Sequence, residues 1–388
     1  MIDIAAWTFW LSVAFLVYIY GGFAIFVAAA GLWRRRHVAR APIRPTASLL
    51  IAAYNEQGVI ADRLANALAL DYPRDHLQII VASDGSSDNT EAIVAGYASR
   101  GVLLLSLPRQ GKIHALTTAV SQATGDILVF SDANTMCDPG ALRALVANFA
   151  DATVGGVAGH TSYRLHTERE SSSAGERLYW DYDAWLKEWE SLTGSVVSAH
   201  GGLYAIRREL FQSSPDPAVT DDFAISTAVI EQGYRLVFDR AARATEFAVA
   251  DARHEFRRRV RLMTRGLRGV VMRRKLLNPF RYGFYAVVLF SHKIARRLAP
   301  IALVSLGATN AYLASHSSFY QIAAVAQGLF YGLAVVGYLL RRARVGGLKI
   351  VWVPFFYCMA NVACAAALIQ LFRGRRIELW QPQRHAVR

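Results

Sequence analysis

The sequence has few cysteines and lacks the glycine motifs of common nucleotide-binding folds. Only 3 of its 388 residues are cysteine, with neither the spacing of a metal site nor a disulfide framework. A soluble part of the chain therefore fits a reducing compartment. No Gly-x-Gly-x-x-Gly follows the first strand candidate and no Walker lysine motif occurs, which argues against a dinucleotide site and a P-loop.

Charged residues are absent from three long stretches. Ile4–Trp33, Leu298–Leu340 and Ile350–Phe372 contain no Asp, Glu, Lys or Arg. Each exceeds the roughly 20 residues that a helix needs to cross a bilayer. The first could instead be a signal peptide, but it has no basic n-region and its apolar run is too long. Ser315–Ser318 interrupts the second stretch, which predicts two spans joined by a tight outer loop.

Basic residues flank these stretches and predict their orientation. Arg34, Arg35 and Arg36 follow the first stretch, and "RGRR" follows the last. Since positive residues favour the cytoplasmic side, we expect the segment after the first span in the cytoplasm. Four spans would leave the basic tail outside, against the same rule. Three explanations of this conflict stay open: a further span at Tyr282–Ser291, a re-entrant segment around Pro354, or an exception to the rule.

The basic surplus is large and concentrated near the apolar stretches. Lys and Arg exceed Asp and Glu by 43 − 29 = 14, and eleven of the basic residues lie between Arg253 and Arg281. Arg257, Arg261, Arg265 and Arg268 share one face of a predicted helix. Such a helix can lie on an anionic leaflet, at about 1 kcal/mol per charge. We expect membrane lipids as partners and no nucleic acid.

The middle of the chain, residues 45–277, has a different pattern. Short apolar strand candidates alternate with helical patterns, which indicates a parallel sheet covered on both faces. The strands are Ala47–Tyr54, Leu77–Ser83, Val102–Leu107 and Asp126–Asp132, and the helices between them are Gly58–Leu70, Asn89–Ser99 and Lys112–Gln122. We predict an open α/β domain of Rossmann type.

Polar segments follow all four strands, at the edge where such sheets bind ligands. They are "YNE" (Tyr54–Glu56), "SDGSSDNT" (Ser83–Thr90), "RQGK" (Arg109–Lys112) and "SDAN" (Ser131–Asn134). Singly, each has an ordinary explanation, because Asp-Gly forms turns and Asp or Asn caps helices. Together they predict one crevice, in which a diphosphate could bind through a cation.

These residues resemble the family 2 glycosyltransferases, in particular the membrane branch with cellulose, chitin, hyaluronan and poly-N-acetylglucosamine synthases. The similar motifs run in the family's order over residues 45–277. They are "AAYNE" (Ala52–Glu56), "SDGSSDNT", "GKIHAL" (Gly111–Leu116), "SDAN", "GGLYAIRREL" (Gly201–Leu210) and "TDDF" (Thr220–Phe223). The set is specific, whereas any single motif is not. The resemblance implies a GT-A fold, a nucleotide-sugar donor that is usually UDP-linked, a Mg²⁺ or Mn²⁺ ion, and inversion at the anomeric carbon.

The resemblance also implies roles at matching positions of the donor site. Ala53, Tyr54 and Glu56 match residues that contact the nucleotide sugar. Asp84 resembles the carboxylate that recognises uracil. Lys112 stands where the family places a residue near the diphosphate.

The cation and the general base are implied in the same way. Asp132 and Asn134 occupy the Asp-x-Asp positions of the cation site. Asn134 offers an amide oxygen but no charge, so we expect the ion to arrive largely with the nucleotide. Asp222 occupies the position of the general base, with Asp221 beside it. From the residues alone, this pair could equally be the acidic first turn of a helix.

Aromatic residues mark a candidate acceptor wall in "YWDYDAWLKEWE" (Tyr179–Glu190). Tyr182, Trp185 and Trp189 are spaced i, i+3, i+7 and share a helix face. Packing against the domain or the membrane interface is one interpretation. The other is stacking of Trp180 and Trp185 on acceptor sugars.

The processive members of the branch carry Gln-x-x-Arg-Trp, and the closest segment here is "RRVRL" (Arg258–Leu262). Arg261 matches the arginine and is expected to face the donor diphosphate, but leucine replaces the tryptophan. This favours addition of a single sugar over processive synthesis. Gly201 and Gly202 are expected to lie on the acceptor side.

The sequence predicts an α/β GT-A (Rossmann-like) cytoplasmic domain with helical transmembrane segments, in a bacterial-type inner membrane. The expected parts are a span at 1–33, the catalytic domain at 45–277, an interfacial basic region at 278–297, spans at 298–372 and a tail at 373–388. We expect transfer of a hexose or N-acetylhexosamine from a UDP-sugar to a lipid-linked or saccharide acceptor. A processive synthase that extrudes its polymer is the alternative within the class. A non-catalytic nucleotide sensor or a transporter subunit is the alternative from another class.

Overall fold

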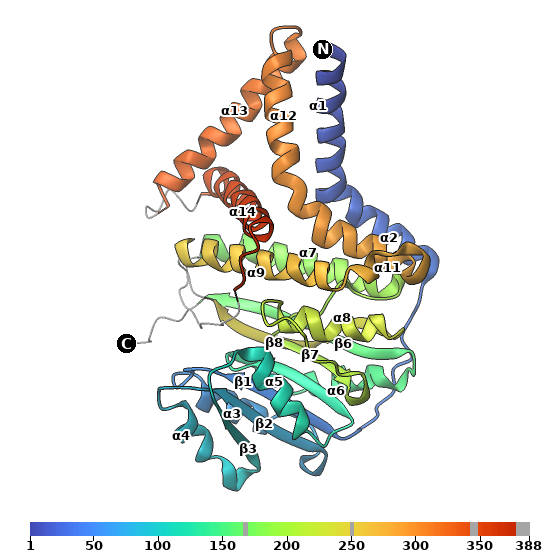
Figure 1. Ribbon diagram of the computed structural model, residues 1–388, viewed down its shortest axis with the longest axis vertical. Helices are drawn as coiled ribbons and strands as arrows, with labels where there is room; N and C mark the ends of the chain where they lie inside the picture. The colour runs from blue at the N-terminus through green and yellow to red at the C-terminus, as the bar shows by residue number, and fades with distance from the viewer. Residues whose placement is uncertain (166–169, 249–251, 342–347, 378–388) are drawn as a thin grey trace.

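The computed structural model describes the chain except residues 166–169, 249–251, 342–347 and 378–388. One mixed sheet of eight strands forms its lower part, in the order β3-β2-β1-β4-β7-β6-β8-β5 (Figure 1). The strands are β1 (Ala47–Ala53), β2 (Leu77–Asp84), β3 (Val102–Leu107), β4 (Ile127–Asp132), β5 (Thr135–Cys137), β6 (Val154–Leu165), β7 (Leu203–Arg207) and β8 (Arg235–Ala248).

The first half of the sheet is the predicted one. β1 pairs in parallel with both β2 and β4, and β2 pairs in parallel with β3. The connecting helices are α3 (Ile60–Leu68), α4 (Thr90–Ala95) and α5 (Lys112–Ser121). Every residue of β1 is buried, because helices cover both faces of the sheet. The predicted parallel arrangement is confirmed for these four strands, and all four of the polar segments meet at the carboxyl edge.

The second half of the sheet is mixed. β7 runs antiparallel to β4 and to β6, β6 runs parallel to β8, and the short β5 pairs antiparallel with β8. The helices α6 (Ala141–Ala147) and α8 (Asp221–Glu231) belong to this half. The antiparallel strand β7 brings the segment before it, Gly201–Gly202, to the carboxyl end of β4, because Ser131 pairs with Leu203.

Long apolar helices rise from one side of this domain (Figure 1). Three are long and apolar enough to cross a membrane: Ile2–Arg34, Ser318–Leu339 and Lys349–Phe372. The first comprises α1 (Ile2–Val17), a π-helical turn η1 (Tyr18–Gly22) and α2 (Phe23–Arg34); the others are α13 (Ser318–Leu339) and α14 (Lys349–Phe372), and the shorter α12 (Ala299–Leu313) lies beside α1. The predicted break at Ser315–Ser318 separates α12 from α13.

A layer of helices separates the sheet from the apolar helices. α7 (Glu170–Thr193) and α9 (Ala252–Met272) run across the top of the domain in Figure 1. The chain then continues through α10 (Pro279–Tyr282), α11 (Phe284–Leu289) and a π-helical turn η7 (Phe290–Ile294). At about 1.5 Å per residue, α10 and α11 are far too short to cross a bilayer. The suggested further span at Tyr282–Ser291 is therefore absent from the described structure.

α14 packs on α9 over much of its length. Phe356 lies under the guanidinium of Arg259 with 4.5 Å to the ring centre. Further along α14, the sulfur of Cys364 is 3.4 Å from that of Met263, and α9 also hydrogen-bonds Gln370. In Figure 1, α14 is seen nearly end-on directly above α9, whereas α1 and α12 stand upright. Pro354 lies inside this continuous helix, so the segment is not re-entrant.

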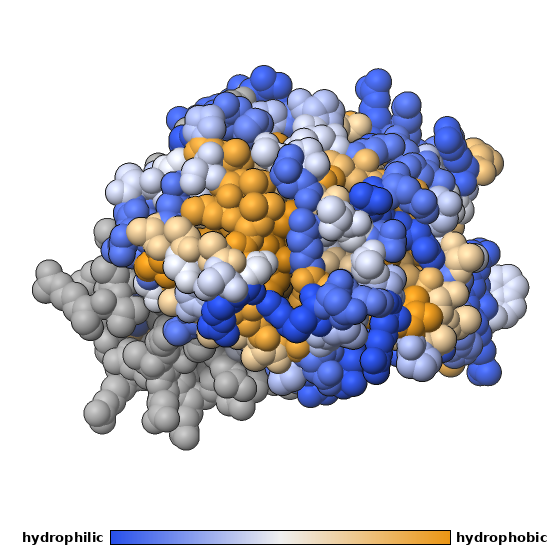
Figure 2. Space-filling model, turned by 90° about the horizontal axis from the view of Figure 1, so that it is seen from below, coloured by the Kyte–Doolittle hydropathy of each residue, from blue (hydrophilic) through white to orange (hydrophobic). Residues whose placement is uncertain are grey.

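The face of the domain far from the apolar helices is mainly hydrophilic. Figure 2 views the molecule from below and shows blue residues over most of the surface, with one apolar area among them. In contrast, large apolar side chains of the candidate spans are widely exposed, among them Ile322, Leu329 and Ile350. Exposed apolar residues gathered on long helices are typical of a lipid-facing surface.

Candidate functional site

The loops after β1 and β2 hold each other through hydrogen bonds. Asn55 has a positive φ of 53°, and its Oδ1 accepts a hydrogen bond of 2.8 Å from the amide of Ser87. The amide of Glu56 donates to Thr90 Oγ1 over 2.8 Å. Asn tolerates the left-handed region better than most residues, so the chain can turn back here. The two motifs therefore form one unit, with the Glu56 side chain buried beneath it.

Asp84 at the end of β2 is fully buried and surrounded by donors. Its Oδ1 accepts from the amides of Gln110 (2.8 Å) and Gly111 (2.9 Å), and its Oδ2 pairs with the guanidinium of Arg109. The same guanidinium lies 3.4 Å from the centre of the Tyr54 ring. The sequence analysis gave roles to Tyr54 and Asp84 but none to Arg109, which joins them. It placed Arg109 only in the polar segment that follows β3.

Lys112 connects the two halves of the sheet. Its Nζ is 2.6 Å from Asp132 Oδ1 at the end of β4 and 2.9 Å from Asp221 Oδ2 at the start of α8. Burial alone would lower the pKa of Lys112, but these two carboxylates raise it. Burial and the charges of Asp221 and Asp222 raise the pKa of Asp132, which Lys112 opposes. Lys112 therefore links the carboxyl end of β4 to the start of α8 through two carboxylates.

The neighbours Asp221 and Asp222 differ in their surroundings. Asp221 is buried and ion-paired with Lys112. Asp222 is partly exposed; its Oδ1 accepts from the amide of Phe223 over 2.7 Å. A Cβ at Gly201 would lie 3.9 Å from Asp222 Oδ2, 3.6 Å from Lys112 Nζ and 3.5 Å from Asp132 Oδ2. Asp222 therefore presents one oxygen toward the space beside Gly201.

Arginines of α9 hold the loop that precedes this acidic pair. The buried Arg265 donates to the carbonyl of Val219 over 2.6 Å, and its charge interacts with Asp221 and Asp222. Arg268 forms an ion pair of 2.5 Å with Asp216. The sequence predicted the basic face of α9 but not this contact. Arg261 lies one turn before Arg265, and burial together with the charges of its neighbours lowers its pKa.

The candidate cation ligands lie together in the turn between β4 and β5. Asp132 Oδ1 is bound to Lys112, while its Oδ2 faces Gly201. Asn134 is partly exposed and its amide makes no hydrogen bond to the residues the structure describes. Among those residues, no group of three or more His, Cys, Asp and Glu is arranged to hold a metal ion. One carboxylate and one amide oxygen fit a hard cation that takes its remaining ligands from a diphosphate and water.

The aromatic face of α7 packs toward the first apolar helix. A Cβ at Gly31 of α2 would lie 2.7 Å from the Trp189 ring, so the two helices are in close contact. Trp185 is 36% exposed and lies between Tyr182 and Trp189, with ring centres 6.3 Å and 6.1 Å away. This arrangement agrees with packing near the membrane, and an acceptor role of Trp185 stays a prediction. The Trp180 side chain is outside the described residues.

The two glycines of the acceptor motif face in different directions. Gly201 approaches the carboxylate cluster. A Cβ at Gly202 would instead lie 2.5 Å from Glu246 Oε1 and 2.8 Å from Thr161 Oγ1, inside the sheet layer. Gly202 is therefore a packing requirement in this structure, and Gly201 is the one that borders the site.

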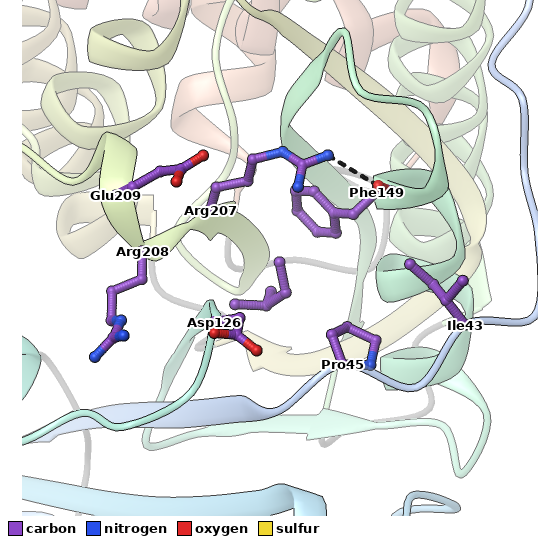
Figure 3. A pocket seen from close by; sticks show the side chains of 8 residues that line it. Ile43, Pro45, Asp126, Phe149, Arg207, Arg208 and Glu209 are labelled. Carbon is purple, nitrogen blue, oxygen red and sulfur yellow. Dashed lines mark hydrogen bonds between the residues drawn. The ribbon is translucent and has the colours of Figure 1, made fainter.

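A pocket of about 180 Å³ lies at the other end of the sheet (Figure 3). It is lined by Asp126 and Ile127, at the start of the strand that carries Asp132 at its end. Its Arg207 donates to the carbonyls of Val154 and Phe149. This guanidinium holds backbone groups together, and the pocket does not reach the carboxylate cluster.

Comparison with known proteins identifies the domain that carries these residues. Residues 48–214 match the family described as Glycosyl transferase family 2. A poly-beta-1,6-N-acetyl-D-glucosamine synthase of Staphylococcus aureus is 30% identical over 204 residues, which are 50% of this chain and 48% of the relative. The probable glycosyltransferase YdaM of Bacillus subtilis is 27% identical over 270 residues, 63% of each protein. The chain thus matches about half the length of the first of these curated relatives.

A solved structure has the same fold over nearly the whole chain. The mannosyltransferase PcManGT from Pyrobaculum calidifontis, in complex with GDP-Man and Mn²⁺, superimposes with a TM-score of 0.69 at 23% identity. The likeness covers 95% of this chain and 100% of that one. It confirms the predicted GT-A fold and extends to the helices outside the family 2 domain.

Proposed function

Because residues 48–214 form a Glycosyl transferase family 2 domain, we propose that the chain is an inverting membrane glycosyltransferase. It moves a hexose or N-acetylhexosamine from a UDP-sugar to an acceptor hydroxyl, in the synthesis of an exopolysaccharide or glycolipid. The observation that carries this proposal is the cluster of Asp132, Asp221 and Asp222 around Lys112, beside the loops that hold Asp84.

The donor's base is proposed to bind between Tyr54 and Asp84. The buried carboxylate would accept the imide N–H of uracil, and the aromatic ring offers a stacking surface. Arg109 now occupies both contacts, so it has to move aside for the base. Lys112, at the start of α5, would then face the diphosphate. Ala53 and Glu56 line the floor of this part of the site.

A divalent cation, Mg²⁺ or Mn²⁺, is proposed to be held by Asp132 and Asn134. When bound, such an ion stabilises the charge that develops on a departing diphosphate. Asp132 keeps one oxygen on Lys112 and has the other toward Gly201. The amide of Asn134 adds an oxygen without charge, which fits an ion that arrives with the nucleotide. Arg261 is proposed to add a positive charge near the same diphosphate.

Asp222 is proposed as the general base. The acceptor oxygen forms a bond to the anomeric carbon while the bond from that carbon to the diphosphate oxygen breaks, and the electron pair leaves with the diphosphate. The hydroxyl proton passes to Asp222 Oδ2, the oxygen that faces Gly201. Attack opposite the leaving group inverts the configuration. Asp221 is held by Lys112 and is less suited to take a proton.

Single addition is preferred over processive synthesis. Leu262, in place of the tryptophan of the processive motif, is 43% exposed and offers no ring for an acceptor sugar. The S. aureus relative is named as a polymer synthase, so product length is the deciding measurement. A ladder of long chains would contradict the preference.

The catalytic domain is proposed to lie in the cytoplasm of a bacterial-type cell. Three segments are proposed to cross the membrane: α1 together with α2, then α12, then α13. α14 packs along α9, and the charge of Arg376 in the tail acts on Asp216 of the catalytic domain. Both observations support an α14 that lies along the membrane surface. Three crossings then keep the basic tail in the cytoplasm, which removes the conflict with the positive-inside rule.

The activity is tested with the purified full chain, a panel of UDP-sugars with GDP-mannose as comparison, and Mg²⁺ or Mn²⁺. We expect release of UDP from one UDP-sugar, and loss of release when EDTA removes the ion. Release of GDP alone would contradict the UDP assignment. Nucleotide binding without turnover, for any donor and any lipid or saccharide acceptor, would favour the non-catalytic alternative.

The membrane arrangement is tested with single cysteines introduced by His316→Cys and Arg376→Cys in a background without the native cysteines. In intact cells, a membrane-impermeant thiol reagent should label position 316, between α12 and α13, and leave position 376 unlabelled. Lysis should make position 376 reactive. Labelling of both positions in intact cells would contradict three crossings.

A further inference from the structure

The π-helical turn η7 carries a lysine whose ammonium is not in an ion pair with any residue the structure describes. The Lys293 side chain makes no hydrogen bond within those residues, faces the ring of Phe223, and is only partly buried. We propose that Lys293 binds the phosphate of a lipid-phosphate acceptor beside Asp222. This inference rests on the proposed function, since it assigns the chemistry of the acceptor.

The turn that carries Lys293 is fixed on three sides. Ser291 Oγ lies 2.6 Å from the hydroxyl of Tyr18, in the first apolar helix. His292 Nδ1 lies 2.9 Å from Glu190 Oε1 of α7. Arg297 donates to the carbonyls of His292 and Lys293 over 3.0 Å and 2.9 Å. The position of Lys293 is therefore determined by its neighbours, although its own ammonium is unpaired.

The ammonium points toward the start of α8. Lys293 Nζ lies 5.7 Å from the centre of the Phe223 ring, and Phe223 directly follows Asp222. Burial and the charge of Arg297 together lower the pKa of Lys293 to about 8, although the charge of Asp222 opposes this shift. The lysine is thus close enough to the proposed base for their charges to interact.

The other acidic groups near Lys293, on α7, have partners of their own. Asp183 forms an ion pair of 2.7 Å with Lys187. Burial raises the pKa of Glu190 to about 8 and burial lowers that of His292 far below its ordinary value. Both shifts favour the neutral forms of this pair. Among the described residues, no carboxylate lies within ion-pair distance of the Lys293 ammonium, so an anionic ligand in direct contact would stabilise it.

The location of Lys293 favours an anion that comes from the membrane side. η7 lies between the first apolar helix, which it contacts through Tyr18, and the start of α12 at Ala299. The donor end has its own lysine, Lys112, which is paired with Asp132 and Asp221. A lipid-linked sugar phosphate in the membrane would present its phosphate to Lys293 and a hydroxyl of its sugar to Asp222.

The test measures binding to the purified full chain in an uncharged detergent, followed by tryptophan fluorescence. The probes are farnesyl phosphate, farnesol, inorganic phosphate, and UDP with Mn²⁺. We expect farnesyl phosphate to bind at least about 10-fold more tightly than farnesol, as for one charge-assisted hydrogen bond. Lys293→Gln should abolish this preference and leave UDP affinity unchanged. Lys293→Arg should keep the preference.

Lys275→Gln is the matched control, because Lys275 is exposed and lies outside the turn. Equal affinities of the wild type for farnesyl phosphate and farnesol would overturn the proposal. So would an equal loss in the control, or competition by inorganic phosphate at the same concentration as farnesyl phosphate, which indicates a site for free phosphate. Weaker UDP binding by Lys293→Gln would assign the lysine to the donor. None of these readouts needs turnover, so failure of the proposed reaction is seen separately.

Discussion

The two ends of the candidate site are built differently. At the donor end, Asp84 accepts hydrogen bonds from two backbone amides and pairs with Arg109, so its bonding capacity is filled by the protein. At the membrane end, the carboxylate of Asp222 accepts one hydrogen bond, from the amide of Phe223, and the ammonium of Lys293 forms neither a hydrogen bond nor an ion pair within the described residues. A filled network fixes geometry before a ligand arrives, whereas an unfilled one is completed by the ligand. We therefore expect donor binding to depend on a preformed frame and acceptor binding to depend on single groups.

The largest effect is expected at the membrane end of the site. Asp222→Asn removes the proton acceptor while it keeps the size of the side chain, and should lower transfer by about 10²- to 10⁴-fold. UDP affinity should stay unchanged, because Asp222 is outside the donor frame. Rates and UDP titrations measure this, with the exposed Glu209→Gln as control. Unchanged transfer would remove Asp222 from the mechanism.

The hydrogen-bonded network around Asp84, which we call the donor frame, is broken by Asp84→Asn. The side-chain amide of the new asparagine has only one oxygen, so it cannot accept hydrogen bonds from all the donors around position 84. Its NH₂ group also faces one of those N–H donors. We expect donor affinity to fall by about 10- to 100-fold, with a smaller change in kcat. Initial rates over a range of donor concentrations separate the two constants, and Asp62→Asn on the exposed side of α3 serves for comparison. A pure loss of kcat would speak against the donor frame.

The neighbouring glycines allow a matched test of packing against function. Gly202→Ala places a methyl 2.5 Å from Glu246 Oε1 and should lower the free energy of unfolding by about 1–3 kcal/mol. Gly201→Ala meets its nearest atom at 3.5 Å, so stability should change by less than about 0.5 kcal/mol while transfer falls. Thermal unfolding and transfer rates of both variants distinguish the packing role of Gly202 from the site role of Gly201. Equal destabilisation by the two changes would contradict the assignment of Gly201 to the site border.

The smallest effect concerns pH and the contact between α7 and η7. Burial raises the pKa of Glu190 from an ordinary 4.5 to about 8. Between these values the unfolded chain releases the proton and the folded protein keeps it, so stability falls as pH rises through this window. Glu190→Gln lacks this proton, and its melting temperature relative to wild type should rise from pH 5 to pH 8. Glu188 is partly exposed and pairs with Arg240 at 3.4 Å, so Glu188→Gln should follow the pH dependence of the wild type. A constant difference would indicate that Glu190 is already ionised in the folded state at pH 5.

The first half of the fold could be predicted because its signals are local. β1 to β4 are short apolar runs, and their ends agree with the predicted ends within a residue. The second half could not, because β6 begins with Val154, two glycines and alternating polar residues and does not resemble a buried strand. Composition predicts α14 as a span, and the helix is long and apolar enough to be one, but composition does not encode the direction in which a helix runs.

The site shows the same limit. Residues directly after predicted strands were found, since a parallel sheet brings all its carboxyl ends to one edge. The position of Lys293, the contact of Arg265 with Val219 and the Glu190–His292 contact were not predicted, because their partners are far apart in the sequence. Their partners are set by how α7, α9 and η7 pack against the domain, and no local pattern records that packing.

The stacking of Arg109 on Tyr54 has a consequence for turnover. A flat cation that donates to Asp84 already covers the surface where the proposed base would stack. When the nucleotide sugar enters, its planar base replaces the planar guanidinium as the group that donates hydrogen bonds to Asp84. The free energy of this exchange is the difference between two similar contacts. The same side chain can return as the spent nucleotide leaves. Departure of the product is thereby assisted by the protein's own arginine, so weak product inhibition by UDP should accompany a well-defined donor specificity.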